Sequence, residues 1–232
     1  MEVREAVERR RSCRAFLDRP VDPTLVRDIV VRAGRAASGG NLQPWIVHVL
    51  TGEPLAALVK TVLEAIGERD PRDLAGDYAI YPEPLWEPFA ARRRAVGLQL
   101  YAALGIGRAD AEGRRAQFRH NFAFFGAPVG ILVALDRRHG PPQWSDLGGY
   151  VATLMLLAEE AGLATCAQEA WTLAHAIVRD HLGLPESEML FCGIALGHGD
   201  QNHPANAFRT ARAAPDDWCR FHGFAADTSR GA

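Results

Sequence analysis

The amino-acid sequence predicts one α+β domain of about four strands and a larger number of helices. Short apolar runs of strand length alternate with longer stretches whose apolar residues recur at helical spacing. At 232 residues the chain is long enough to bury a sizeable core as one unit. The sequence contains no internal repeat, low-complexity tract or linker that would divide it. We therefore expect residues 1–232 to form a single domain.

The first half of the chain is expected to be mainly helical, with one strand and one long irregular stretch. The dipeptide Asp22-Pro23 is typical of a helix start, and the glycines at positions 39 and 40 are typical of a helix end. Repeated prolines in 67–88 predict a loop or lid, and irregular stretches of that length are uncommon unless they serve a site. We expect a strand at 45–51 and helices at 2–10, 23–36, 54–66, 89–104 and 118–125.

The second half is expected to supply the other strands. Its long helix, at 146–161, has a wide apolar surface, so we expect it to be buried on several sides. Thr172 is a candidate helix cap, and Gly183 is a candidate stop for the same helix. The tail from residue 201 onward has no strong period. The expected strands are 129–135, 163–168 and 189–196, with a turn at 140–142 and the capped helix at 172–181.

Composition excludes several classes of protein. Apolar residues make up 48% and charged residues 23%, which is ordinary for a folded soluble chain. The formal charge of −2 supplies no positive field for nucleic acid, and no run of 18 apolar residues exists for a membrane span. The four cysteines are widely spaced and the N-terminus resembles no signal peptide, so we expect a reducing cytoplasm.

The first candidate site is the segment Arg10-Arg11-Ser12-Cys13-Arg14. In an extended segment Arg10, Ser12 and Arg14 point to one face, because side chains alternate along such a chain. Two guanidiniums and a hydroxyl on one face are well matched to a phosphate. The alternative interpretation is a solvated run of charges after a helix.

The second candidate site is Ser38-Gly39-Gly40-Asn41-Leu42-Gln43. Two glycines let backbone groups approach a ligand closely, and Asn41 and Gln43 add donors and acceptors that can read a heterocycle. The alternative is a simple helix stop and turn.

Two later segments complete the set. Gln168-Glu169-Ala170-Trp171 stands just before a helix, where free backbone N–H groups can meet an electron-rich atom of a ring. Arg209 or Arg212 in the polar tail could complete a phosphate site. The alternatives are a plain strand-to-helix connection and solvated arginines.

Other catalytic signals are missing from the sequence. No three-glycine nucleotide fingerprint, P-loop or GxSxG motif occurs, and the eight histidines show neither HxH nor HxxxH spacing. We therefore expect no metal site, and no side chain that by itself carries the chemistry.

Taken together, Arg10–Phe16 and Ser38–Trp45 resemble the nitroreductase family of flavin enzymes. The similarity continues in order through 125–128, 162–166, 168–171, 193–197 and 209–212, and so covers nearly the whole chain. The segments 81–86 and 119–122 are similar to the subgroup that reduces nitrobenzoates and other nitroaromatic compounds.

The resemblance implies a nitroreductase-like fold, with a central mixed but mainly antiparallel sheet flanked by helices, in an intertwined homodimer that binds FMN at its interface. The apolar residues of a C-terminal extension, 201–232, need a surface to cover them; we expect this extension to pack on the partner subunit, and packing on the same chain is the alternative. The cofactor-binding positions that it implies are Arg10, Arg11, Ser12, Arg14, Ser38, Gly39, Gly40, Asn41, Gln43, Gln168, Glu169, Ala170, Arg209 and Arg212. The family usually has glycine where this chain has Ala170, and often has lysine where it has Thr210.

The activity that the resemblance implies is transfer of hydride from NAD(P)H to flavin N5, followed by reduction of an electron-poor small molecule, in a ping-pong sequence. Flavin carries the redox chemistry in such enzymes, which explains the lack of an acid–base pair. We expect the substrate pocket to lie in a lid region, 67–125, and to include Tyr81, Trp86 and Phe124, whose rings can stack on a planar acceptor. The alternatives are core packing for these rings and, for the whole chain, a non-catalytic flavin-binding or regulatory protein, a reductive dehalogenase or a flavin-destroying enzyme.

Overall fold

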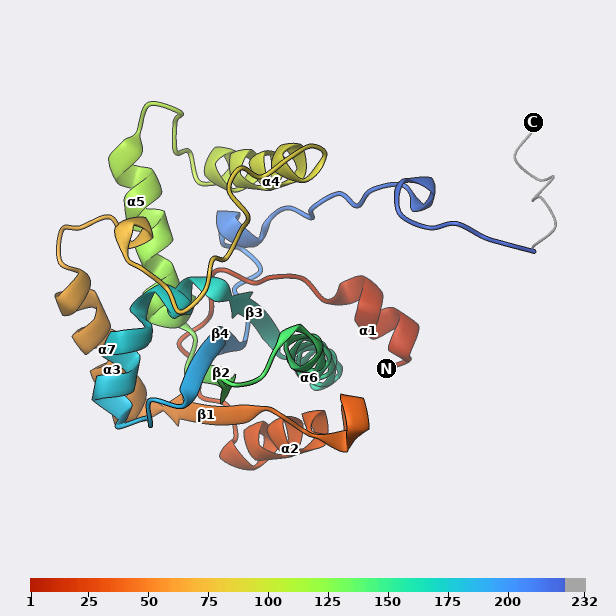
Figure 1. Ribbon diagram of the computed structural model, residues 1–232. Helices are drawn as coiled ribbons and strands as arrows, with labels where there is room; N and C mark the ends of the chain where they lie inside the picture. The colour runs from red at the N-terminus through yellow and green to blue at the C-terminus, as the bar shows by residue number, and fades with distance from the viewer. Residues whose placement is uncertain (224–232) are drawn as a thin grey trace.

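A computed structural model describes residues 1–223 of the chain, and its centre is a four-stranded sheet (Figure 1). The strands are β1 (Ile46–Thr51), β2 (Val129–Asp136), β3 (Ala164–Gln168) and β4 (Glu188–Gly197), in the spatial order β1-β2-β4-β3. All three neighbouring pairs are antiparallel, and one isolated parallel bridge, between Ser12 and Thr165, adds to the β3 edge. The expected α+β class, the four strands and the mixed but mainly antiparallel sheet are confirmed.

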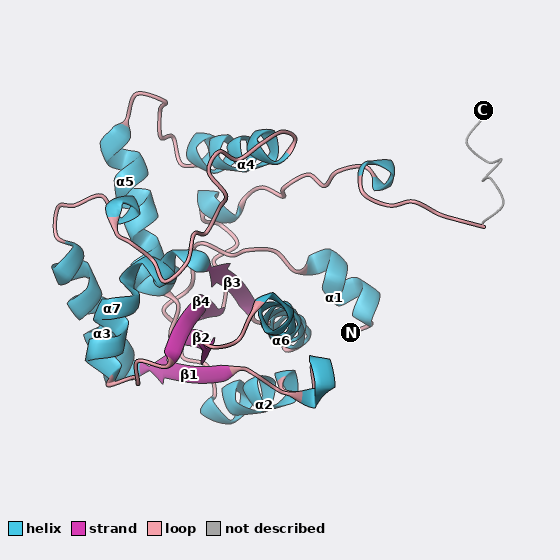
Figure 2. Cartoon of the chain, viewed as in Figure 1, coloured by secondary structure: helices cyan, strands magenta, loops and turns pink. Residues whose placement is uncertain are grey.

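Helices cover both faces of this sheet (Figures 1 and 2). One face carries α2 (Pro23–Ala33) and α6 (Pro141–Glu160), and the other carries α3 (Gly52–Ile66) and α7 (His175–Leu182). Strand β2 lies between them and is buried over nearly its whole length, which explains its unbroken apolar sequence. Side chains alternate along β2, so Ile131 and Val133 enter the core under α6 while Leu132 enters the core under α3.

Several helix ends follow the local chemistry of the sequence. The side chain of Asp22 accepts a hydrogen bond from the Thr24 backbone N–H at 2.8 Å, and Pro23 occupies the first helical turn of α2. Gly183 ends α7 in the left-handed conformation, with a φ of 64°.

Several helices differ from expectation. The helix α5 (Ala111–Arg119) forms where none is predicted, because its polar sequence lacks an apolar period; Asp110 caps it by accepting from the Gly113 N–H at 2.7 Å. The expected helix at 118–125 is instead a 3₁₀ segment, His120–Gly126, with left-handed backbone inside it. Helix α6 begins at Pro141 rather than at 146, so the turn expected at 140–142 is wrong; prolines are well placed in the first turn of a helix.

The cap expected from Thr172 is also wrong. Its hydroxyl donates to the Glu169 carbonyl at 2.8 Å inside a short 3₁₀ helix, Glu169–Ala174, and α7 starts only after that helix. The N-cap position of α7 is Ala174, two residues after Thr172.

The remaining elements lie around this body. They are α1 (Val3–Arg9), α4 (Phe89–Ala103) and the short 3₁₀ turns Gly39–Asn41, Pro71–Asp73, Pro204–Asn206 and Pro215–Asp217. No residue of α4 is buried, and the chain after Asn206 runs outward from the body (Figure 1). Within residues 1–223, no helix is long and apolar enough to cross a bilayer.

Candidate functional site

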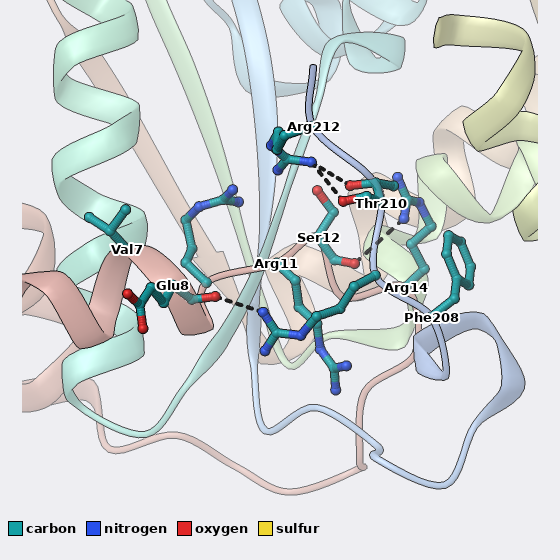
Figure 3. Close-up of a pocket in the computed structure, with 10 residues that line it drawn as sticks. Val7, Glu8, Arg11, Ser12, Arg14, Phe208, Thr210 and Arg212 are labelled. Carbon is teal, nitrogen blue, oxygen red and sulfur yellow. Dashed lines mark hydrogen bonds between the residues drawn. The ribbon is translucent and has the colours of Figure 1, made fainter. Parts of the chain in front are cut away.

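Two segments far apart in the sequence enclose one cavity at the C-terminal end of α1 (Figure 3). The cavity has a volume of about 370 Å³ and lies between the segments 7–14 and 208–212. Six predicted cofactor-binding residues line it: Arg10, Arg11, Ser12, Arg14, Arg209 and Arg212. The arginine-rich motif and the polar tail therefore meet at one place in the fold.

The edge of the sheet positions the first of these segments. Ser12 forms its parallel bridge with Thr165 of β3, and the Cys13 backbone N–H donates to the Thr165 carbonyl at 2.9 Å. Because the segment is extended, successive side chains alternate: Cys13 is buried, while Ser12 and Arg14 stay half-buried at the cavity. The cavity is thus built on the rigid frame of β3.

Asn206 joins the two segments, and sequence reasoning does not identify it. Its side-chain Oδ1 accepts from the Arg14 backbone N–H at 2.7 Å, and its Nδ2 donates to the carbonyls of Ala15 at 2.9 Å and Asp200 at 2.8 Å. The amide is buried, and its hydrogen bonds satisfy three backbone groups. No local pattern signals this role, because Arg14 lies 192 residues away in the chain.

Two arginines of the cavity are engaged by protein groups. Arg209 donates to the carbonyls of Glu8 at 2.6 Å and Arg9 at 3.4 Å, and so satisfies carbonyls at the C-terminal end of α1. The Arg11 guanidinium donates to the side-chain oxygen of Gln201. Arg209 thereby joins the tail segment to α1, whereas Arg11 is bound to a residue outside the cavity lining.

The other side chains leave donors available inside the cavity. Arg14 makes one long hydrogen bond, at 3.5 Å, to the Ser12 carbonyl, and Arg212 folds back on Thr210, whose hydroxyl is 2.7 Å from its Nη1. Among residues 1–223, none of Arg10, Arg14 and Arg212 forms an ion pair. The acidic side chain among the lining residues, Glu8, points away from Ser12 (Figure 3). A hydroxyl with several uncompensated guanidiniums fits a phosphate.

Neutral thiols behind the cavity leave its positive charge uncancelled. Burial raises the pKa of the Cys166 thiol to about 11, against the opposing effect of the Arg14 and Arg10 charges. Burial likewise raises the pKa of Cys13. Both thiols therefore stay protonated at neutral pH.

The loop 38–43 lies on the surface and does not line the cavity. The Gly39 backbone N–H donates to both carboxylate oxygens of Asp146 at 3.2 Å, and the Ser38 hydroxyl accepts from the Gln43 backbone N–H at 3.0 Å. Backbone φ is positive at three of its residues: Gly40, Asn41 and Gln43. The loop has a defined, outward-facing shape, so within one chain the structure does not bring it to the arginines.

The segment Gln168–Ala170 lies at the C-terminal end of β3. Because Ser12 and Thr165 are bridged in parallel, α1 lies toward the other end of that strand. With a rise of about 3.3 Å per residue, Gln168 lies roughly 10 Å along the strand from Thr165. Gln168 is buried and donates to the Asn121 carbonyl at 2.8 Å, and its Oε1 has no partner among the described residues. Glu169 is exposed, yet enough protein surrounds it that desolvation raises its pKa.

The predicted aromatic residues divide into two groups. Tyr81 is 42% exposed and Trp86 is 57% exposed, and Trp86 meets Phe89 edge-on with ring centroids 5.5 Å apart. Burial raises the pKa of Tyr81, the charge of Glu169 raises it further, and Arg93 opposes both effects. Both rings remain accessible to a planar molecule.

The prediction that Phe124 lines a substrate pocket is wrong. Its ring has no exposed surface, stacks on Trp171 at a centroid distance of 4.2 Å, and lies against the bare Cα of Gly130. A left-handed backbone at Phe124, with a φ of 47°, turns the ring into the core under α3.

Comparison with known proteins decides the family. The sequence model of a protein family described as "Nitroreductase family" matches residues 7–198. The chain belongs to the nitroreductase family. Its match to the family model takes in the arginine-rich motif, the glycine loop and the segment after β3, but ends before the arginines of the tail.

Curated nitroreductases match this chain over almost its full length. The chain is 35% identical to the nitrobenzene nitroreductase of Ectopseudomonas oleovorans over 94% of its own length and 96% of that protein. It is 37% identical to the 4-nitrobenzoate reductase of Pseudomonas putida over 94% of each. Among solved structures, the FMN and NADPH-dependent nitroreductase NfnB from Sphigopyxis sp. strain HMH is 45% identical, with a TM-score of 0.92 over 97% of this chain and 100% of that one.

Proposed function

We propose that this nitroreductase-family protein is an FMN-dependent NAD(P)H oxidoreductase that reduces nitroaromatic or similarly electron-poor compounds. The observation that carries the proposal is the cavity in which Ser12, Arg14 and Arg212 converge beside β3. Its donors suit the FMN phosphate, and the relatives that match the chain throughout are nitroreductases. FMN, when bound, would accept hydride from NAD(P)H and return two electrons to the acceptor in a ping-pong sequence.

The chain's own residues would bind and orient the cofactor. Arg10, Ser12 and Arg14 would donate to the phosphate and ribityl chain, while Arg209 would hold the tail against α1. The backbone of Glu169 and Ala170 would face the reactive side of the ring, with Gln168 held in place by its bond to Asn121. Ala170 is buried, so its methyl group already has space in the fold.

A homodimer would complete the site. The loop of Ser38, Gly39, Gly40, Asn41 and Gln43 faces outward, which suits contact with a cofactor held by a partner subunit. In the extension 201–232, the described part runs away from the body and leaves Trp218 69% exposed (Figure 1). Residues 224–232 lie outside the described part of the chain. A second copy would cover this apolar arm.

The lid region 67–125 would admit the acceptor. Tyr81 and Trp86 present accessible rings on which an electron-poor aromatic compound can stack, whereas Phe124 supports the core beneath. The four cysteines are free, and three of them are buried, which suits the reducing cytoplasm.

Spectroscopy of the purified protein tests the proposal directly. We expect a yellow protein whose flavin absorbance bleaches when NADPH is added without oxygen and recovers when 4-nitrobenzoate is added. Size-exclusion chromatography with light scattering should give twice the mass of the chain. A colourless protein that takes up no FMN would contradict the proposal, and one that binds FMN but never oxidises NADPH or NADH would support a flavin-binding role instead.

A further inference from the structure

The irregular stretch 67–88, which we call the lid loop, is attached to the body of the protein at residues 76–78. The side chain of Asp77 is only 9% exposed, and a carboxylate is rarely so enclosed unless it is paired. Both terminal nitrogens of Arg137 donate to its Oδ1 at 3.4 Å, and the Nδ1 of His175 lies 3.2 Å from its Oδ2. Arg137 directly follows β2 and His175 begins α7, so one carboxylate connects the lid loop to two elements of the body.

Arg137 is itself held in place by the turn before β4. Its Nε donates to the Glu186 carbonyl at 2.6 Å, and its backbone N–H donates to the Ser187 carbonyl at 2.8 Å. One of its terminal nitrogens also donates to the Glu188 carbonyl at 3.4 Å. Because the guanidinium is restrained by these bonds, its contact with Asp77 fixes the lid loop to a defined point at the end of the sheet.

Tyr78 provides a second attachment next to the first. Its hydroxyl donates to the carbonyl of Phe191 in β4, and its ring lies 5.0 Å from the Trp144 ring and 6.3 Å from the Phe191 ring, measured between centroids. Burial raises the pKa of Tyr78, so the hydroxyl keeps the proton that it donates. The attachment therefore combines a hydrogen bond with aromatic packing.

The lid loop also packs on the segment that the proposed function places at the flavin ring. A Cβ added to Gly76 would lie 3.4 Å from the Thr172 hydroxyl oxygen and 3.5 Å from the Thr172 carbonyl oxygen. That hydroxyl donates to the Glu169 carbonyl at 2.8 Å, in the turn that begins the segment. A loop residue thus lies against the group that holds the Glu169 carbonyl.

Tyr81, whose ring is expected to stack on the acceptor, stands three residues beyond Tyr78 on the same loop. Three residues span at most about 11 Å, so an attachment at 76–78 limits where the Tyr81 ring can lie. The ring also has a cation–π contact with Arg93 at 4.2 Å, but Arg93 belongs to α4, in which no residue is buried. The attachment of this part of the loop to the body is therefore the one at 76–78.

We propose that Asp77 is a positioning residue for the acceptor. By holding the lid loop to Arg137 and His175, it fixes where Tyr81 stands relative to the segment that begins at Glu169. The proposal rests on the proposed oxidoreductase function and goes beyond it, since it names a residue that acts on the acceptor through another side chain. Asp77 lies far from the arginine cavity in the sequence and is not among its lining residues, so its effect should fall on the acceptor and not on FMN binding.

Stopped-flow oxidation of the reduced, FMN-loaded protein tests this role. The Asp77→Asn variant keeps the shape of the side chain and removes its charge. The concentration of 4-nitrobenzoate that gives half of the maximal oxidation rate should rise about three-fold to ten-fold, which is the range expected when an aromatic contact is lost. The maximal rate, the dissociation constant for FMN and the rate of oxidation by ferricyanide, which needs no stacked ring, should each stay within about two-fold.

Two further variants frame this result. Tyr78→Phe loses only the hydroxyl bond to Phe191, so it should raise the half-saturating concentration of 4-nitrobenzoate by a smaller factor. Asp28→Asn is the matched control, because it breaks an exposed aspartate–arginine pair on α2, and it should change none of these values.

Hydrogen exchange followed by mass spectrometry gives a readout that needs no turnover. In the Asp77→Asn variant the amides of residues 73–86 should exchange faster, whereas those of residues 7–14 should be unchanged. An unaltered half-saturating concentration of 4-nitrobenzoate in Asp77→Asn would overturn the proposal, whatever the exchange shows. So would a loss of FMN or a slower reaction with ferricyanide, either of which would make Asp77 a support of the whole flavin site. If the unaltered protein takes up no FMN, the oxidoreductase function fails instead, and exchange in 73–86 still decides whether Asp77 holds the lid loop.

Discussion

Replacing Arg14 by alanine tests the phosphate cavity at one of its half-buried guanidiniums. The guanidinium of Arg14 is half-buried, has no acidic partner among the described residues, and makes only one long bond to the Ser12 carbonyl. The backbone N–H of Arg14, which bonds to Asn206, is kept in the variant. The change therefore removes a phosphate ligand while leaving the segment that carries it in place.

The size of the effect follows from the charge and burial of the lost group. A hydrogen bond between charged partners contributes about 1.5–3 kcal/mol, which corresponds to roughly ten- to a hundred-fold in affinity. Arg14 gives up only one long hydrogen bond within the chain when it binds the phosphate, so little of the binding free energy is offset by that loss. We expect the dissociation constant for FMN to rise by that factor.

The dissociation constant is measured by titrating the apoprotein with FMN and monitoring the quenching of flavin fluorescence. Arg11→Ala is the matched control, since it removes the same charge from a neighbouring residue whose guanidinium is held by Gln201. It should weaken FMN by less than about five-fold, because exposed polar pairs contribute about 0–1 kcal/mol. Equal dissociation constants for Arg14→Ala and the unaltered protein, with circular dichroism unchanged, would refute the assignment of this cavity to phosphate.

Three further predictions concern the acceptor, the core and the pH dependence of stability. Trp86→Ala should change the ratio of kcat/KM between 4-nitrobenzoate and nitrobenzene and leave the flavin spectrum alone; loss of FMN would instead assign Trp86 a structural role. Gly193→Ala should lower the free energy of unfolding by about 1–3 kcal/mol in urea titrations, because the new Cβ would lie 2.2 Å from the Trp171 ring, whereas Gly97→Ala, in open space, should cost nothing. At pH values above 4.5, the ordinary carboxyl pKa, the Glu169→Gln variant should unfold at a higher temperature than the unaltered protein. Below that pH the difference in unfolding temperature should vanish. Desolvation raises the pKa of Glu169, so the carboxyl group lowers the stability of the fold once it loses its proton. Scanning calorimetry from pH 4 to 8 measures the effect, and a difference in unfolding temperature that does not change with pH would contradict it.

Local chemistry was sufficient to predict most of the secondary structure. Strands β2 and β4 are apolar runs that are buried on both faces of the sheet, and the Asp22-Pro23 and Gly183 signals act within their own turn of chain. The predictions that failed concern segments whose structure the local sequence does not signal. Helix α5 is polar and lacks a period, and the left-handed backbone at Phe124 is maintained by contacts with Trp171 and Gly130 that come from other elements.

Candidate site residues could be found in the sequence, but their arrangement could not. The alternation of Arg10, Ser12 and Arg14 predicts a common face, and resemblance to a family indicates a phosphate for it. Asn206, which joins that segment to the tail, has no signal of its own, because its partners lie nearly the whole chain away.

The division of roles among the arginines shows where sequence information ends. By itself the sequence determined the fold class, the four strands and the identity of the side chains at the cavity, since each depends on residue type and short-range spacing. Only the tertiary structure decided that Arg209 satisfies the end of α1, that Arg11 turns to Gln201 and that Arg14 keeps its donors available. Whether a guanidinium binds a protein group or stays available depends on which atoms the folded chain brings within about 3 Å of it, and no local pattern contains that distance.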